Sequence, residues 1–243
     1  MKKFVFVVLS CLFFSMAFSQ DTLQATNNNK VSFQKRAADH FMLQLSSDHW
    51  ASMPDSISSH QSGFSRGFNA YVMFNKQFKN SPKISIAIGV GVSTSNIVFK
   101  KMNIGVTAAP GYLPFTPLDS ADHFKKYKLA STFLEIPLEF RYTAKPNNAD
   151  KSFKAAIGLK AGTLVNVHTK GKNLVDRNGT TLNGYTEKEN SKRFFNTTHF
   201  MATARIGYGI FSLFGSYQLN GILKEGAGPT LKLYQVGLTL SGL

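Results

Sequence analysis

Two glutamates and an arginine share one parity within a single short run of the chain. Glu135, Glu139 and Arg141 lie at odd positions between Phe133 and Tyr142. Side chains two or four residues apart in a β-strand point to the same face, so these three charges would lie together. Paired carboxylates can serve acid–base catalysis, and carboxylates beside a guanidinium form ion pairs. The opposite parity is wholly apolar and comprises Leu134, Ile136, Leu138, Phe140 and Tyr142.

Ser47 and His49 form a second constellation with the residue types of a hydrolase. A serine nucleophile needs a base beside it and a third group that orients the base. Both residues share a parity, but Asp48 points the other way, and no other acidic residue completes a triad. We therefore interpret the pair as polar residues at a membrane rim beside an interfacial Trp50. A lipid-modifying hydrolase, similar to a lipid A deacylase and using Ser47 and His49, is the alternative.

The remaining histidines show no spacing that is typical of a metal site. Three are expected at strand ends and two in loops: His40, His168, His199, His60 and His123. No glycine-rich phosphate cradle or dinucleotide fingerprint occurs in the chain. We predict no metal, no cofactor and no enzymatic activity.

Basic residues outnumber acidic ones, 28 to 13, and give a net charge of +15. One basic stretch comprises Lys170, Lys172, Arg177, Lys188, Lys192 and Arg193. Such an excess favours an anionic partner. Nucleic acid does not fit a secreted chain whose aromatic residues alternate with aliphatic ones. We expect instead contacts with outer-membrane lipid, with the phosphates of lipopolysaccharide, or with other envelope or secretion-system proteins. A merely solvated face is the alternative.

The N-terminus has the pattern of a secretory signal peptide. Lys2 and Lys3 precede an apolar run, and the small residues Ala17 and Ser19 suit a peptidase site, which predicts a signal peptide over residues 1–19. The single cysteine, Cys11, is lost with it, so the mature chain forms no disulfide. Residues 20–38 are polar and lack periodicity, and we interpret them as a flexible leader. Residues 39–243 then form one barrel domain.

Strand-like alternation recurs in eight runs along this domain. The first begins near Asp39, and the others span 66–78, 84–93, 133–142, 153–168, 199–208, 211–220 and 234–241. Long loops are expected over 100–126 and 169–195. Within the second, Asp176 to Gly179 is a turn signal that would pair two extensions above the barrel.

The connections alternate between long and short, which decides what faces the interior. Outer-membrane barrels have even strand numbers, short periplasmic turns and longer extracellular loops. A soluble lipocalin-like barrel would need its larger apolar residues inside and a polar exterior. The pattern therefore predicts an all-β fold, an eight-stranded antiparallel up-and-down transmembrane β-barrel. It would be integral to the cell outer membrane, with both termini in the periplasm.

Charged residues on the interior parity would then fill the lumen. An eight-stranded barrel is just wide enough for side chains, so we expect no conduction. Buried charges must be paired, which predicts a lumen ion network of Glu135, Glu139, Arg141, Lys160 and Arg205. Hydrated lumen groups without a shared network are the alternative. Pro137 lies between the two glutamates and should interrupt the ladder.

Two short motifs carry a family resemblance. Leu134-Glu135-Ile136-Pro137-Leu138, the long loop before it and the final Tyr234-x-Val236-Gly237-Leu238 run resemble the PorT family of outer-membrane β-barrel proteins from Bacteroidetes-type bacteria. The resemblance implies a barrel of the OmpA and OmpX size class. It also implies a link to type IX secretion, with which the founding member is associated. The functional hypothesis is a non-enzymatic barrel with long basic extracellular loops for envelope or ligand interaction.

Overall fold

The computed structural model of the chain describes residues 41–62, 64–109 and 111–241. The predicted signal peptide and leader lie outside the described residues. Eight long strands are β1 (Phe41–Ala51), β2 (Arg66–Phe78), β3 (Ser81–Phe99), β6 (His123–Thr143), β7 (Phe153–Val175), β9 (Thr198–Tyr208), β10 (Phe211–Gln218) and β11 (Lys232–Ser241). The smaller elements are α2 (Asp55–Ser58), β4 (Met102–Ile104), β5 (Phe115–Pro117), the 3-10 helix η3 (Pro146–Lys151) and β8 (Thr181–Asn190).

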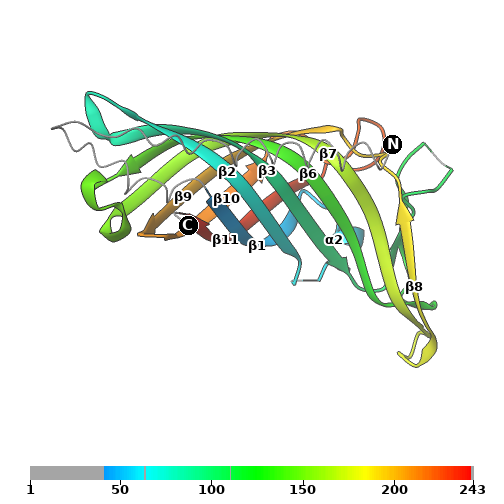
Figure 1. Cartoon of the computed structure of the whole chain (residues 1–243). Coiled ribbons are helices and arrows are strands. Elements are labelled where there is room, and N and C mark those ends of the chain that lie inside the picture. Colours follow the sequence, from blue (N-terminus) through cyan, green and yellow to red (C-terminus); the bar gives the residue numbers. More distant parts are fainter. Residues whose placement is uncertain (1–40, 63, 110, 242–243) are drawn as a thin grey trace, which may run out of the picture. The chain divides into compact units, whose positions relative to one another are not determined.

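The eight long strands close into an antiparallel barrel (Figure 1). Each pairs with its neighbours in the chain, β1 pairs with β11, and β6 pairs with β7. This confirms the predicted eight-stranded antiparallel fold. β8 pairs only with β7 and extends this part of the sheet beyond the ring. No helix in the described ranges is long and apolar enough to cross a membrane.

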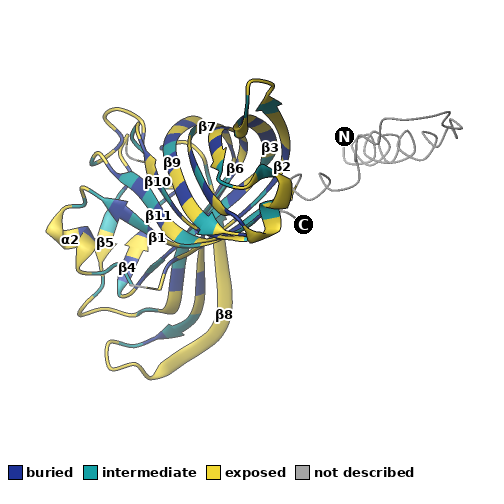
Figure 2. Cartoon of the chain, turned by 90° about the vertical axis from the view of Figure 1, so that its left-hand side faces the viewer, coloured by how far each residue is buried: buried dark blue, intermediate teal, exposed yellow. Residues whose placement is uncertain are grey.

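Buried residues alternate with more exposed ones along the strands of the ring (Figure 2), because successive side chains point to the interior and the exterior in turn. In β6, Ile136 is 54% exposed whereas its neighbour Glu135 is 0% exposed. Leu134, Leu138 and Phe140 are exposed like Ile136. The outer surface is therefore a broad apolar belt, as expected for a barrel whose natural solvent is lipid.

The two ends of the barrel differ. Short connections join β2 to β3, β6 to β7 and β9 to β10 at one end, the turn end. The opposite loop end carries longer connections, including the small β4–β5 hairpin, and the β7–β8 extension. The apolar core fills the lumen towards the loop end and includes Ile97, Phe99, Leu129, Phe195 and Leu231.

Both predicted long loops contain more strand than expected. β6 already begins at His123, and β4 and β5 pair within the first loop. β7 continues to Val175 and, together with β8, covers most of the second, so the prediction of a loop over 169–195 was wrong. The turn at Asp176 does join two paired extensions, as the sequence suggested, and its side chain accepts hydrogen bonds from two following backbone amides. These strands continue because their alternation continues beyond the apolar belt.

Trp50 faces the lumen and not the membrane interface. It is 5% exposed, and its ring lies 5.5 Å from that of Phe99 and 6.4 Å from that of Phe115. The expected interfacial position was wrong because Trp50 has the interior parity of β1, together with Asp48.

Pro137 interrupts the ladder on one side only. The register between β3 and β6 passes from Ile88 opposite Leu138 to Gly91 opposite Glu135, with no pair between them. On the other side, Pro137 is paired with Lys160 of β7. Proline has no amide hydrogen to donate, so a missing ladder bond is the physical consequence.

Candidate functional site

Glu139 lies between two arginines inside the barrel. Arg141 donates from Nε to Glu139 Oε2 at 2.7 Å, and Arg205 donates from Nη2 to the same oxygen at 3.1 Å. Glu139 is 2% exposed, and both arginines are also buried. Charge-assisted hydrogen bonds of this kind satisfy a carboxylate that water cannot reach.

Glu135 belongs to a second lumen group, closer to the loop end. Tyr71 donates its hydroxyl hydrogen to Glu135 Oε2 at 2.5 Å, and Lys160 Nζ lies 3.0 Å from the Tyr71 oxygen and from Gln44 Oε1. His199 Nε2 lies 3.0 Å from Glu135 Oε1. The ring of His199 stacks on Phe133 with centroids 3.8 Å apart.

The five predicted lumen residues therefore all point inward, in two groups. Sequence reasoning missed Tyr71, His199 and Gln44, which link Glu135 to Lys160. His199 lies at the start of β9, as expected, and its side chain is buried inside the barrel. Its interior parity on β9, shared with Arg205, was the available signal. None of these groups is accessible to a substrate from solvent.

Five lysines share the outward surface of the sheet extension at the loop end. Lys128 of β6 is opposite Lys170 of β7, which is opposite Lys188 of β8, and Lys126 is opposite Lys172 in the next row. We call these five residues the lysine face. Like charges directly opposite each other on adjacent strands are destabilising. Because such pairs recur in adjacent rows, solubility alone does not explain why lysines occupy these positions.

A bulge in β7 turns Lys170 and Lys172 outward. The β6–β7 register shifts between Thr132 and Phe133, where β7 passes from Leu164 to Asn166 and leaves Val165 without a partner. An extra residue in one strand exchanges its two faces. Lys160 therefore points into the lumen while Lys170 points outward, although the two share a parity in the sequence.

The carboxylates of the extension lie on its other face. Glu187 and Glu189 alternate with Lys188 on β8, and Glu189 accepts a hydrogen bond from Thr107 at 2.8 Å. The lysine face thus lacks a neutralising partner from β8. Burial and then nearby Lys170 hold the pKa of Lys128 below its usual value.

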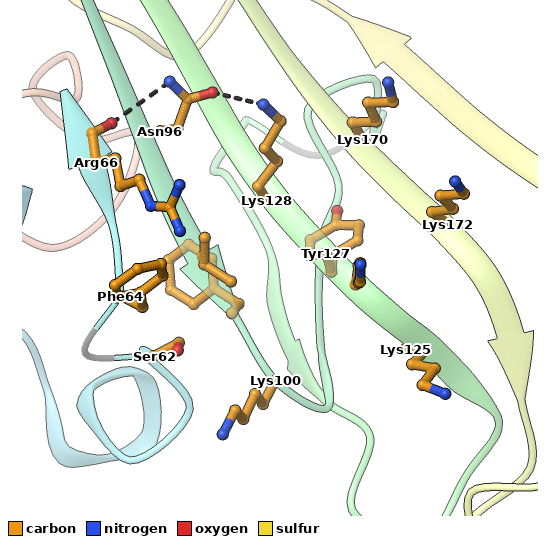
Figure 3. Close-up of a pocket in the computed structure, with 13 residues that line it drawn as sticks. Ser62, Phe64, Arg66, Asn96, Lys100, Lys125, Tyr127, Lys128, Lys170 and Lys172 are labelled. Carbon is orange, nitrogen blue, oxygen red and sulfur yellow. Dashed lines mark hydrogen bonds between the residues drawn. The ribbon is translucent and has the colours of Figure 1, made fainter. Parts of the chain in front are cut away.

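A groove of ≈ 640 Å³ runs beside the lysine face (Figure 3). Phe64 and Val98 contribute apolar surface to it. Asn96 accepts a hydrogen bond from Lys128 Nζ at 2.6 Å. The basic residues that line it are Arg66, Lys100, Lys125, Lys126, Lys128, Lys170 and Lys172, and none of the described lining residues is acidic.

Only three of the six residues in the predicted basic stretch belong to the lysine face or line the groove. Lys170, Lys172 and Lys188 belong to the lysine face, whereas Arg177 occupies the hairpin turn. The other two, Lys192 and Arg193, follow β8 in the connection to β9, where Arg193 donates to the Ala108 carbonyl at 3.3 Å.

Lys126 and Lys128 were missed because the predicted loop ended at residue 126 and the predicted strand began only at Phe133. The alternation of Lys126, Tyr127, Lys128 and Leu129 was the signal that the strand continues. Similarly, His168 was expected near a strand end but lies within β7, on its outward face and two residues before Lys170.

Ser47 and His49 meet on the outer surface of β1. Ser47 Oγ lies 2.9 Å from His49 Nε2, and the His49 ring stacks on Tyr234 at 5.4 Å. Asp48 points into the lumen, where Gln235 donates to it at 3.0 Å. Ser47 and His49 therefore form a pair that the adjacent Asp48 does not complete to a triad. Across the described ranges, no group of three or more His, Cys, Asp or Glu residues is arranged to hold a metal ion.

The closed ring, the apolar belt and the filled lumen agree with the comparison to known proteins. A family model described as Outer membrane protein beta-barrel domain matches residues 18–223. The chain belongs to this family. It is accordingly an integral outer-membrane β-barrel. The match is to this broad family and does not extend to the narrower PorT family.

One solved structure similar to this outer-membrane barrel is Ail, the attachment invasion locus protein of Yersinia pestis. The two share 14% identity and a TM-score of 0.33, over 83% of this chain and 95% of that one. A likeness of this strength carries no information on residues or function. No curated protein matches the chain.

Proposed function

We propose that this outer-membrane barrel is a non-enzymatic binding protein whose lysine face holds a phosphate-bearing envelope glycolipid, lipopolysaccharide. In this proposal the loop end is extracellular and both termini are periplasmic. The filled lumen is a non-conducting scaffold that positions the extension above the membrane.

One observation carries the proposal: opposed lysines lie beside a groove whose lining is both basic and apolar. Lys128, Lys170 and Lys188 repel one another, and a bound phosphate would relieve that repulsion. The apolar part of the groove, formed by Phe64 and Val98, suits the acyl region next to a phosphate. An amphiphilic anion matches both properties.

Binding can be tested with the full-length protein in phosphatidylcholine nanodiscs. We expect lipid A bisphosphate to bind the wild type more tightly than its dephosphorylated form. The triple variant Lys128→Gln, Lys170→Gln, Lys188→Gln should lose about tenfold or more in affinity, because three phosphate contacts are removed. Binding should weaken as salt increases.

The matched control is the triple variant Lys76→Gln, Lys79→Gln, Lys151→Gln. These three exposed lysines lie near the turn end, so the control removes the same charge elsewhere. An equal loss in both triple variants would indicate a general charge effect and overturn the proposal. Equal binding of the two lipid A forms would do the same.

The proposed orientation has its own test. Asn178→Cys lies in the β7–β8 turn, and Asn148→Cys lies in the turn between β6 and β7. A membrane-impermeant maleimide should label only the first on intact cells. Labelling of the second alone would reverse the orientation.

A role in type IX secretion rests only on the PorT resemblance. Deletion of the gene should then block export of type IX cargo, with an unrelated secreted protein as control. Normal cargo export would leave the glycolipid proposal standing and remove this one.

A second candidate function is that of a lipid-modifying hydrolase. It is favoured by the hydrogen-bond distance between Ser47 and His49. Ser47 would attack the ester carbonyl while His49 takes its proton, and the lipid alcohol would leave with that proton. Water would then hydrolyse the acyl-enzyme and release the fatty acid. Replacement of both by Ala should then change the acyl composition of lipid A or phospholipid when compared with wild type. Identical lipids in wild type, double variant and deletion strain would exclude this activity.

A further inference from the structure

A hollow interrupts the apolar belt on the outer surface of β9, β10 and β11. It measures ≈ 410 Å³, and its small residues are Ala202, Ala204 and Gly215, with Tyr217 and Tyr234 beside them. Gly215 is opposite Ala204, and Tyr217 is opposite Ala202. One row closer to the turn end, the same surface carries large exposed side chains: Leu45, Ile206, Leu213 and Leu238.

Packing within the chain does not account for the missing side chain of Gly215. A Cβ there would meet only the Gln235 carbonyl oxygen, at 3.9 Å, which is an ordinary contact. Gly237 on the adjacent strand differs, because a Cβ there would overlap the Leu45 carbonyl. Glycine weakens a strand interior and often marks the close approach of another molecule. Gly215 therefore points to an occupant from outside the chain.

Polar groups border the hollow on its loop-end side. His49 stacks on Tyr234 and lies within 2.9 Å of Ser47. Lys232 Nζ lies 5.6 Å from the centre of the Tyr217 ring. Apolar surface that ends in hydroxyl groups, an imidazole and an ammonium is complementary to an acyl chain that ends in an anionic headgroup.

We propose that this hollow binds one acyl chain of an anionic glycerophospholipid. The chain lies against Ala202, Ala204 and Gly215, and the headgroup phosphate lies near Lys232 and His49. The three small residues leave room for a single chain, whereas a glycolipid presents several side by side. The site is independent of the lysine face, which lies on β6, β7 and β8 and not on these strands.

The test uses the full-length protein in phosphatidylcholine bilayers that contain phosphatidylglycerol with a photoreactive acyl chain. We expect crosslinks to concentrate on β9, β10 and β11. Gly215→Phe fills the hollow and should lower this labelling about tenfold, as should Ala204→Phe. Leu213→Phe is the matched control, because it adds a ring on the same outward face outside the hollow. Heat-modifiable gel mobility reports which variants fold.

The headgroup is tested with the same photoreactive chain on phosphatidylethanolamine. Phosphatidylglycerol should label more strongly, and Lys232→Gln should remove the difference. Labelling spread evenly around the belt, or an equal loss with Leu213→Phe, would overturn the site. Stronger labelling by a photoreactive lipid A would show that the hollow binds a glycolipid, and it would overturn the phospholipid assignment. None of these outcomes depends on the lysine-face triple variant.

Discussion

Residues that carry charge in this barrel have opposite environments inside and outside the ring. In the lumen, Glu139 is satisfied by Arg141 and Arg205. On the extension, Lys170 is opposite two other lysines, and the carboxylates of β8 point to the other face. The first arrangement stabilises a scaffold, and the second keeps a cationic surface available. The pKa of His168 depends on the charge of that surface, because Lys128 and Lys188 lie near its imidazole.

We predict that His168 titrates below its ordinary pKa. Burial and then the charges of Lys188, Lys128 and Lys170 lower the pKa of His168 from 6.5. The folded state therefore resists protonation, so this contribution to stability is complete above about pH 6.5 and is lost as the pH falls. NMR titration of the imidazole would measure the pKa. Lys188→Gln or bound lipid A bisphosphate should raise it, and a wild-type pKa above 6.5 would contradict the arrangement.

Glu139→Gln should destabilise the folded barrel by about 3 to 5 kcal/mol, because it leaves two buried guanidinium groups facing a neutral amide. Urea unfolding in lipid vesicles would measure the change in free energy. Glu225→Gln, at an exposed loop position, is the control and should have little effect. A similar small effect at both sites would show that the lumen charges are hydrated and independent.

At the scale of elements, β6 and β7 continue beyond the belt, and β8 pairs with β7 outside the ring. The lysines of these three strands lie on the outward face, and Glu187 and Glu189 of β8 lie on the other face. Closure of the ring depends on a different contact, between β1 and β11. There Gly237 is opposite Ser46 and allows the two backbones to approach.

Gly237→Ala should impair assembly of the barrel. Its added Cβ would overlap the carbonyl of Leu45, so the closing pair of strands must separate or shift. Gly184→Ala on β8 is the control, since a Cβ there meets no atom within 4 Å. Heat-modifiable gel mobility after refolding would give the folded fraction of each. Equal folding of the two variants would show that the closure tolerates a wider spacing.

The whole molecule combines a filled ring with an exposed extension. Apolar side chains such as Phe99 and Leu129 occupy the loop-end lumen, and the Glu135 and Glu139 groups occupy the interior beyond them. This filling separates the barrel's structural role from any binding role of its outer surfaces.

We predict that the purified protein forms no steady channel in planar lipid bilayers. Eight strands leave room only for side chains, and large buried residues fill that room here. Single-channel recording would check this, with a large porin as the conducting control. Stable ohmic openings would contradict a packed lumen.

The sequence by itself determined the class of fold and the direction of most side chains. Alternation with a period of two is a local property, so Glu135 and Ile136 could be assigned to opposite faces without a structure. The order of long and short connections then favoured a membrane barrel over a soluble one.

Only the tertiary structure decided which distant residues meet. Strand register depends on bulges and on closure of the ring, which local alternation does not encode. The bulge at Val165 places Lys160 inside and Lys170 outside. Pairing across the ring brings His199 to Glu135, and pairing across the extension aligns Lys170 with Lys188. The lysine face exists because β6 and β7 extend in register beyond their predicted ends and β8 pairs with β7.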